Sequence, residues 1–177
     1  MQRLAGGTMK KMLSAFALFL LASISTANDL GYDPDADPFD QYQQAIEQAT
    51  STNKLVLIVA GGDWCRWCHV LNRFVASNDD VEARLNDTFV VMKVYVGPGN
   101  FNELFFSQLP QAYGAPHFWI VSPEREVLAS QSTAKLERGK STYDKQSFLA
   151  FIEQWKKVAT GPERHARTSE DDIPRNF

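Results

Sequence analysis

Two cysteines three residues apart are the part of this sequence best suited to chemistry. Cys65 and Cys68 are the only cysteines among the 177 residues, so they cannot form the framework of a small disulfide-rich scaffold. They lie in the segment Trp-Cys-Arg-Trp-Cys-His, shortly after the apolar run from Leu55 to Ala60. A pair at this spacing can close a disulfide and open it again. We therefore interpret it as a site of thiol–disulfide exchange.

The residues around the pair indicate which sulfur attacks. We expect a helix to begin at the cysteines, so that Cys65 lies in its first turn, where unpaired N–H groups and the helix dipole favour a thiolate. Arg66 adds a positive charge beside it. Cys65 is therefore the expected nucleophile. Cys68, three residues on and facing the same way, is the expected resolving cysteine.

Three other interpretations of this segment remain open. The run from Cys65 to His69 also fits the C-x-x-C-H pattern of covalent c-type haem attachment. A metal site formed by Cys65, Cys68 and His69 is the second, but a structural zinc needs four ligands, and His117 and His165 are the only other histidines, so we expect no metal. A protein that keeps the same fold for binding, without turnover, is the third possibility.

Apolar patterning predicts the elements that hold the cysteines. The continuous run from Leu55 to Ala60 suits a strand buried on both faces. An amphipathic helix from Phe39 to about Thr52 precedes it, and the helix that starts at the cysteines ends near Ala76. Two glycines and an aspartate interrupt the apolar pattern between the strand and the cysteines. This order predicts that the cysteine pair follows a buried strand and lies at the start of the next helix.

The rest of the chain shows further strand and helix patterns. Ser77 and Asp80 resemble a capping box before a second short helix. We expect the two tryptophans further on, Trp119 and Trp155, to be core residues because each lies in a periodic apolar pattern. The remaining expected elements are a strand over 89–96, a helix over 102–109, a hairpin of strands 118–121 and 127–129, and a last helix from Asp144 to about Val158.

The first 27 residues have the features of a secretory signal peptide. Basic residues precede an apolar run from Met12 to Ala22, and small residues follow at Ser25 and Ala27. The run is too short for a permanent transmembrane helix. We expect cleavage after Ala27, export to the periplasm or a similar oxidising space, and no stable membrane insertion. The expected organisation is then an exposed lead-in over 28–38, one domain over 39–160 and a polar, flexible tail over 161–177.

The charge balance limits the classes of partner. The chain is 22% charged and 44% hydrophobic, as in an ordinary globular domain. Three of its 18 basic residues and none of its 21 acidic residues lie in the first 27 positions, so the mature chain has a formal charge of −6. That gives no basic surface for nucleic acid. Proteins or small thiols are the expected partners.

From Phe39 to Val158 the sequence resembles the thioredoxin-like superfamily, and in particular its exported branch, in which a helix precedes the first buried strand. The resemblance implies an α/β fold with a central mixed β-sheet flanked by helices. It implies a thiol-disulfide oxidoreductase acting on protein thiols and disulfides without a bound cofactor. A reductant or isomerase supplied by a membrane-bound electron donor is favoured over an oxidant.

The resemblance also implies a cis-proline opposite the disulfide, and Ala115-Pro116 occupies the matching position. There Ala115 would offer its backbone to a substrate strand, beside His117. The two tryptophans that flank the cysteines could form an apolar rim that a partner covers. The expected substrate-binding residues are therefore Trp64, Arg66, Trp67, Ala115, Pro116 and His117.

One position departs from the family pattern. Many thioredoxins carry a buried aspartate in the strand before the motif, and Val59 stands there in this chain. Lys93 matches the lysine that usually partners that acid. The resemblance therefore implies that another base, His69 or Glu103, assists the resolving cysteine.

Overall fold

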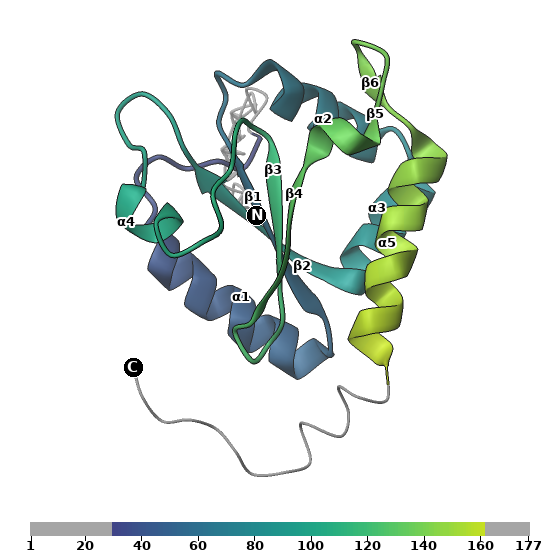
Figure 1. Cartoon of the computed structure of the whole chain (residues 1–177), viewed down its shortest axis with the longest axis horizontal. Coiled ribbons are helices and arrows are strands. Elements are labelled where there is room, and N and C mark those ends of the chain that lie inside the picture. Colours follow the sequence, from purple (N-terminus) through teal and green to yellow (C-terminus); the bar gives the residue numbers. More distant parts are fainter. Residues whose placement is uncertain (1–29, 162–177) are drawn as a thin grey trace, which may run out of the picture.

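A four-stranded mixed sheet forms the centre of this protein, in a computed structural model that describes residues 30–161 (Figure 1). The strand order is β2-β1-β3-β4. β1 is parallel to β2 and antiparallel to β3, and β3 is antiparallel to β4. The strands are β1 (Leu55–Gly61), β2 (Phe89–Tyr95), β3 (His117–Val121) and β4 (Val127–Ser132). The expected mixed sheet is confirmed, as is the hairpin of β3 and β4.

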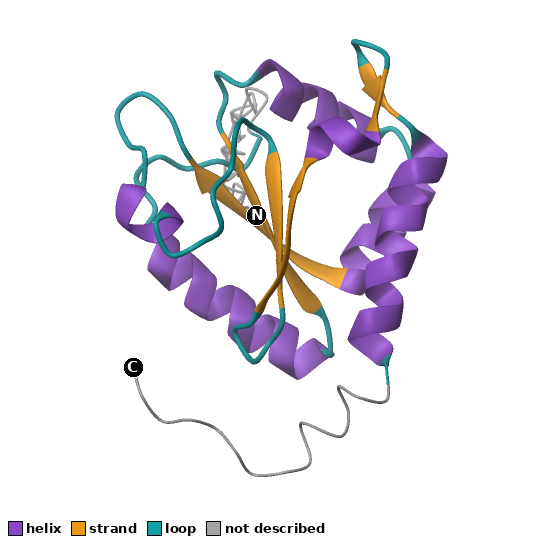
Figure 2. Ribbon diagram, viewed as in Figure 1, coloured by secondary structure: helices purple, strands orange, loops and turns teal. Residues whose placement is uncertain are grey.

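Helices cover both faces of the sheet (Figure 2). The α1 and α4 side chains pack in one apolar cluster, and those of α2, α3 and α5 pack in another. The helices are α1 (Pro38–Thr52), α2 (Arg66–Ala76), α3 (Asp79–Thr88), α4 (Glu103–Phe106) and α5 (Lys145–Thr160). This arrangement confirms the expected fold class.

β1 lies between two other strands, and all seven of its residues are buried. Successive side chains of a strand point to opposite faces, so Leu57 packs in the α2 cluster and Ile58 in the α1 cluster. This two-sided burial explains why the sequence shows a continuous apolar run in place of alternation. Trp119 and Trp155 are buried as expected.

Aspartates cap the two longest helices. Asp37 accepts a hydrogen bond from the Phe39 N–H at 2.8 Å and Asp144 accepts one from the Ser147 N–H at 2.8 Å, which satisfies N–H groups that lack partners within the helix. The expected capping box at Ser77 is wrong. The Ser77 N–H bonds to the Arg73 carbonyl and so ends α2, and α3 begins after Asn78 without a side-chain cap.

The lead-in before α1 is exposed only in part. Its acidic residues at 33, 35 and 37 are exposed as expected, whereas Leu30 and Tyr32 are 2% and 6% exposed. The Lys93 amine donates a hydrogen bond to the Leu30 carbonyl. A segment this short has no periodicity to reveal its contacts, and the bond to β2 explains why it packs against the domain.

Other differences concern short elements. The helix expected over 102–109 is confined to Glu103–Phe106. The structure adds a 3-10 turn, η1 (Thr133–Leu136), and two-residue strands β5 (Glu137–Arg138) and β6 (Thr142–Tyr143), which are too short to produce a pattern. The expected signal peptide over 1–27 and nearly all of the expected tail lie outside the described residues. Within residues 30–161, no helix combines the length and apolar character needed to cross a membrane.

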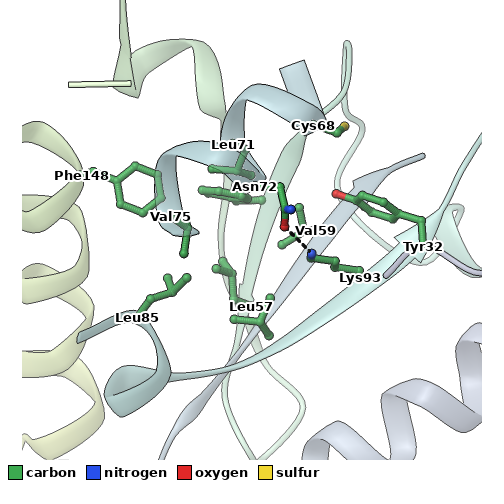
Figure 3. A pocket seen from close by; sticks show the side chains of 12 residues that line it. Tyr32, Leu57, Val59, Cys68, Leu71, Asn72, Val75, Leu85, Lys93 and Phe148 are labelled. Atoms are coloured by element: carbon green, nitrogen blue, oxygen red, sulfur yellow. Dashed lines mark hydrogen bonds between the residues drawn. The ribbon is translucent and has the colours of Figure 1, made fainter. Parts of the chain in front are cut away.

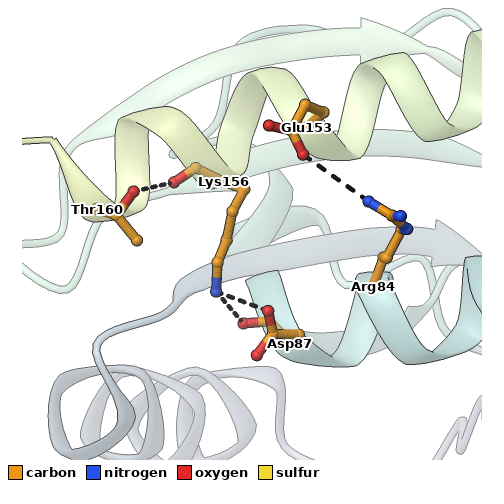
Figure 4. A network of polar contacts seen from close by, with 5 residues as sticks. All are labelled: Arg84, Asp87, Glu153, Lys156 and Thr160. Atoms are coloured by element: carbon orange, nitrogen blue, oxygen red, sulfur yellow. Dashed lines mark hydrogen bonds and ion pairs between the residues drawn. The ribbon is translucent and has the colours of Figure 1, made fainter.

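α3 and α5 pack side by side and carry ion pairs on their outer faces (Figure 4). Lys156 Nζ lies 2.8 Å from Asp87 Oδ2, and Arg84 lies 4.0 Å from Glu153. The hydrogen bond from Lys156 lowers the pKa of Asp87. Exposed pairs of this kind add little to stability, so the apolar contacts beneath them hold the two helices together.

Candidate redox site

A disulfide joins Cys65 and Cys68 at the start of α2, and their Cα atoms lie 5.2 Å apart. Both cysteines are 2% exposed. Cys65 is the residue that caps the helix, and its Sγ accepts the Cys68 N–H at 3.1 Å. The helix therefore begins at the cysteines as the sequence predicts. On reduction the same N–H and the helix dipole would stabilise a thiolate at Cys65.

The indole of Trp64 lies across two glycines next to the disulfide. A Cβ at Gly97 would stand 2.2 Å from Trp64 Nε1, and a Cβ at Gly62 would stand 2.6 Å from it, so a larger residue at either position would displace the ring. Trp64 Nε1 also donates a hydrogen bond to the Val96 carbonyl at 2.8 Å. The ring is held in one place while 54% of the residue stays exposed, which makes it accessible to a partner.

The residues between the cysteines point in different directions. Arg66 is exposed. Trp67 is half-buried and meets the Tyr143 ring edge-on, with ring centroids 5.5 Å apart. Trp67 therefore belongs partly to the packing between α2 and β6, a contact that the sequence, which suggested a rim position, did not predict.

Ala115-Pro116 precedes β3 and contains a cis peptide bond, as the resemblance implied. The register pairs Ala60 with His117, so Pro116 stands level with Gly61, where β1 ends. Ala115 packs against the apolar cluster that includes both cysteines. The structure thus brings Ala115 and the cysteine pair to the same end of the sheet.

His117 lies elsewhere. Its ring nitrogen is 2.8 Å from Ser130 Oγ, and its ring centroid is 4.5 Å from that of Trp119, a residue in the cluster on the α1 face. His117 is buried, and burial lowers its pKa. The structure does not bring this predicted substrate-binding side chain to the cysteines, because adjacent strand residues point to opposite faces.

An open groove of about 490 Å³ lies beside Trp64. Its lining is mostly apolar and includes Trp64, Phe101, Phe106, Ala115 and Trp119. Phe101 is 53% exposed. The groove therefore connects the accessible tryptophan with the loop before the cis-proline.

The inner side of Cys68 borders a separate cavity of about 70 Å³ (Figure 3). Val59 pairs with Lys93 in the β1–β2 register, as the resemblance implied, and both line this cavity. The bases expected from the sequence do not. His69 bonds through its ring to the Asp63 carbonyl at 2.7 Å, and Glu103 lines the groove beside Trp64.

Tyr32 is the residue at this cavity that the sequence did not reveal. A Cβ at Gly61 would stand 2.6 Å from Cys68 Sγ and 2.7 Å from the Tyr32 hydroxyl oxygen. Both groups therefore border the space beside Gly61 that a side chain would fill. Tyr32 lies 33 residues before Cys65 in a segment rich in acids, so no local motif links it to the cysteines.

Two of the three rival interpretations, the metal site and c-type haem attachment, gain no support from the geometry. Among residues 30–161, no group of three or more His, Cys, Asp or Glu side chains is placed to hold a metal ion. The segment from Cys65 to His69 follows a buried sheet strand, whereas c-type haem attachment would be expected in a small helical domain. The arrangement is instead that of two cysteines joined by a disulfide at the start of a helix.

Comparison with known proteins agrees with the fold. A family model described as thioredoxin-like matches residues 37–123. The structure of a disulphide isomerase from Xylella fastidiosa Temecula1 is 25% identical, with a TM-score of 0.61, over 72% of this chain and 98% of that one. The C-terminal domain of DsbD from Neisseria meningitidis, in its oxidised form, is 14% identical, with a TM-score of 0.50, over 68% of this chain and 97% of that one.

Two curated relatives match a shorter segment. An uncharacterised protein of Caenorhabditis elegans is 36% identical over 61 residues, and spermatogenesis-associated protein 20 of Homo sapiens is 31% identical over 61 residues. Each match covers 33% of this chain and 8% of the relative. This protein therefore corresponds to a small part of those relatives. The family match over residues 37–123 and the structures together confirm a thioredoxin-like fold, in which the WCxxC motif carries the Cys65–Cys68 disulfide.

Proposed function

We propose that this protein is a thiol-disulfide oxidoreductase whose substrates are disulfides and thiols of other proteins. The observation that carries the proposal is the Cys65–Cys68 disulfide, closed at the start of α2 next to the exposed Trp64 and the loop at Ala115. A purely structural disulfide would need no accessible apolar surface near it. Here a groove of about 490 Å³ is lined by Trp64, the residue before Cys65, and by Ala115.

The reaction follows from the positions of the two sulfurs. The Cys65 thiolate attacks one sulfur of a substrate disulfide, forms a mixed disulfide and releases the other substrate sulfur as a thiolate. Cys68 then loses its proton to that released thiolate and attacks Cys65 Sγ. The Cys65–Cys68 disulfide forms, the second substrate thiolate leaves, and two electrons have passed to the substrate. The reverse sequence oxidises a substrate dithiol.

The groove offers a place for the substrate chain. Trp64 and Phe101 provide exposed aromatic surface, which binds apolar side chains of a partner. Ala115 lies before β3 at the edge of the groove, where its backbone groups can pair with an extended substrate segment. Arg66 and Trp67 border the same end of α2 and would lie at the margin of the contact.

We place this activity in the periplasm, on the basis of the signal-like features of residues 1–27. N-terminal sequencing of the protein recovered from that compartment should begin at Asn28, and recovery with Met1 intact would contradict export by cleavage. Within that compartment we propose a reductant or isomerase supplied by a membrane-bound electron donor. The likeness to a structure described as disulphide isomerase supports this direction.

The midpoint potential of the Cys65/Cys68 couple tests the direction. It is measured by equilibrating the protein with glutathione or dithiothreitol redox buffers and labelling free thiols. A value between about −270 mV, as in thioredoxin, and about −180 mV, as in disulfide isomerase, is the expected result. A value near about −120 mV, as in the strong periplasmic oxidase, would overturn the proposed direction and indicate an oxidant.

A further inference from the structure

We propose that Tyr32, in the segment before α1, donates a hydrogen bond to the Cys68 thiolate during the resolving step. The proposal rests on the proposed function, because it assigns a residue to the same redox site. Its basis is the environment of Cys68 on the side away from solvent, where Tyr32, Lys93 and Asn72 line a cavity of about 70 Å³ (Figure 3).

The position of Tyr32 is defined by Gly61. The site that a Gly61 Cβ would occupy lies 2.6 Å from Cys68 Sγ and 2.7 Å from both the hydroxyl oxygen and the ring carbon of Tyr32 that bears it. Glycine at this point of β1 therefore lets the phenol approach the sulfur. In Figure 3 the Tyr32 hydroxyl points into the cavity that Cys68 borders.

Lys93 holds the segment that carries Tyr32. Its amine donates to the Leu30 carbonyl and, at 3.3 Å, to Asn72 Oδ1. The same amine lies 5.7 Å from the centre of the Tyr32 ring, within reach of a cation–π contact. These bonds tie the segment to β2 and α2. The hydroxyl is therefore positioned before the reaction begins, and little ordering is needed during it.

The charged and titratable groups around Cys68 favour a donor at this point. Of the described residues that line the cavity, the titratable ones besides Cys68 are Tyr32 and Lys93, and none is a carboxylate. Burial, and then the nearby Tyr143 and Asp63, raise the pKa of Tyr32. Its hydroxyl thus keeps its proton over the range in which thiols ionise. It can stabilise a thiolate but cannot act as the base.

The step balances without a further reactant. The proton of Cys68 passes to the substrate thiolate released in the first attack. The Cys68 thiolate, stabilised by the Tyr32 O–H, attacks Cys65 Sγ, and the bond from Cys65 to the substrate breaks. The electron pair leaves with the second substrate sulfur, and Tyr32 ends the step with its own proton.

Tyr32→Phe tests this role, because it removes one hydroxyl and keeps the ring beside Lys93. In a Cys65→Ser background, the pKa of the single thiol at Cys68 is read from the pH dependence of its ¹³Cβ chemical shift. With both cysteines present, reduced protein is mixed with oxidised glutathione, and rapid acid quench with mass spectrometry separates the attack by Cys65 from the resolution by Cys68.

A matched control removes a hydroxyl on the opposite face of the sheet. Tyr42 in α1 is half-buried and has its own cation–π contact with Arg125, at 5.6 Å. We expect Tyr32→Phe to raise the pKa of Cys68 and to slow resolution about tenfold, the effect of losing one hydrogen bond to a charged group. The attack rate should stay unchanged, and Tyr42→Phe should change none of the three quantities.

Two results would overturn the assignment: a Cys68 pKa and resolution rate unchanged in Tyr32→Phe, or equal changes in Tyr42→Phe. A merely structural role for Tyr32 would alter the attack and resolution steps alike. Failure of the wild-type protein to react with oxidised glutathione would instead count against the proposed function. The Cys68 titration needs no substrate, so it decides the role of Tyr32 in that case too.

Discussion

Replacing Cys65 by serine should abolish the reduction of protein disulfides by this protein, leaving only the uncatalysed rate. A serine hydroxyl does not ionise near neutral pH, so no nucleophile would remain at the residue that caps α2. The measurement follows reduction of a model protein disulfide with dithiothreitol as the electron source, for the wild-type and variant proteins side by side.

His69→Asn is a matched control on the same helix. The His69 ring bonds to the Asp63 carbonyl and does not line the cavity at Cys68, so this variant should keep most of the activity. Reduction at the wild-type rate by Cys65→Ser would contradict the assignment of Cys65 as the nucleophile. A strong loss of activity in His69→Asn would instead indicate that His69 acts as the base.

The second large effect is on stability. Phe148→Ala should lower the free energy of unfolding by about 3–5 kcal/mol. The Phe148 ring is fully buried and contacts four other aromatic rings, with centroid distances from 5.1 to 6.4 Å. Those rings are Phe74, Phe118, Tyr143 and Phe151. Removing it leaves a cavity where α5, α2 and the sheet meet, so the helix that carries the cysteines loses part of its support.

Urea unfolding of the oxidised protein measures this effect, with Phe101→Ala as the matched phenylalanine control. Phe101 is 53% exposed, so its replacement should change the free energy of unfolding by no more than about 0.5 kcal/mol. Equal losses in the two variants would mean that the ring cluster around Phe148 does not hold the helices to the sheet.

Much of the fold could be predicted because its central elements carry strong patterns. β1 is a continuous apolar run because it is buried on both faces, and α5 shows helical spacing of its apolar residues. The hairpin of β3 and β4 follows from two short apolar runs around a proline-containing turn. Elements whose stability depends on tertiary contacts left no such pattern. The strands β5 and β6 have two residues each.

The candidate site divides in the same way. Cys65, Cys68 and Ala115-Pro116 could be predicted, since each is marked by residue type and by its place next to a predictable element. Tyr32 could not, because its segment is held beside the cavity at Cys68 by the bond between Lys93 and Leu30 and not by a nearby motif. The orientation of His117 was missed because the residue stands next to the proline in sequence, while the pleat of β3 turns its side chain toward Ser130.

The order in which the two sulfurs react is the central claim, and trapping with Cys68→Ser tests it most directly. The reduced variant is incubated with a protein substrate containing one disulfide, and the products are analysed by non-reducing electrophoresis and peptide mass spectrometry. We predict a stable mixed disulfide that joins the substrate to Cys65, because the resolving thiol is missing. Release of reduced substrate at the wild-type rate, with no adduct on Cys65, would contradict the account.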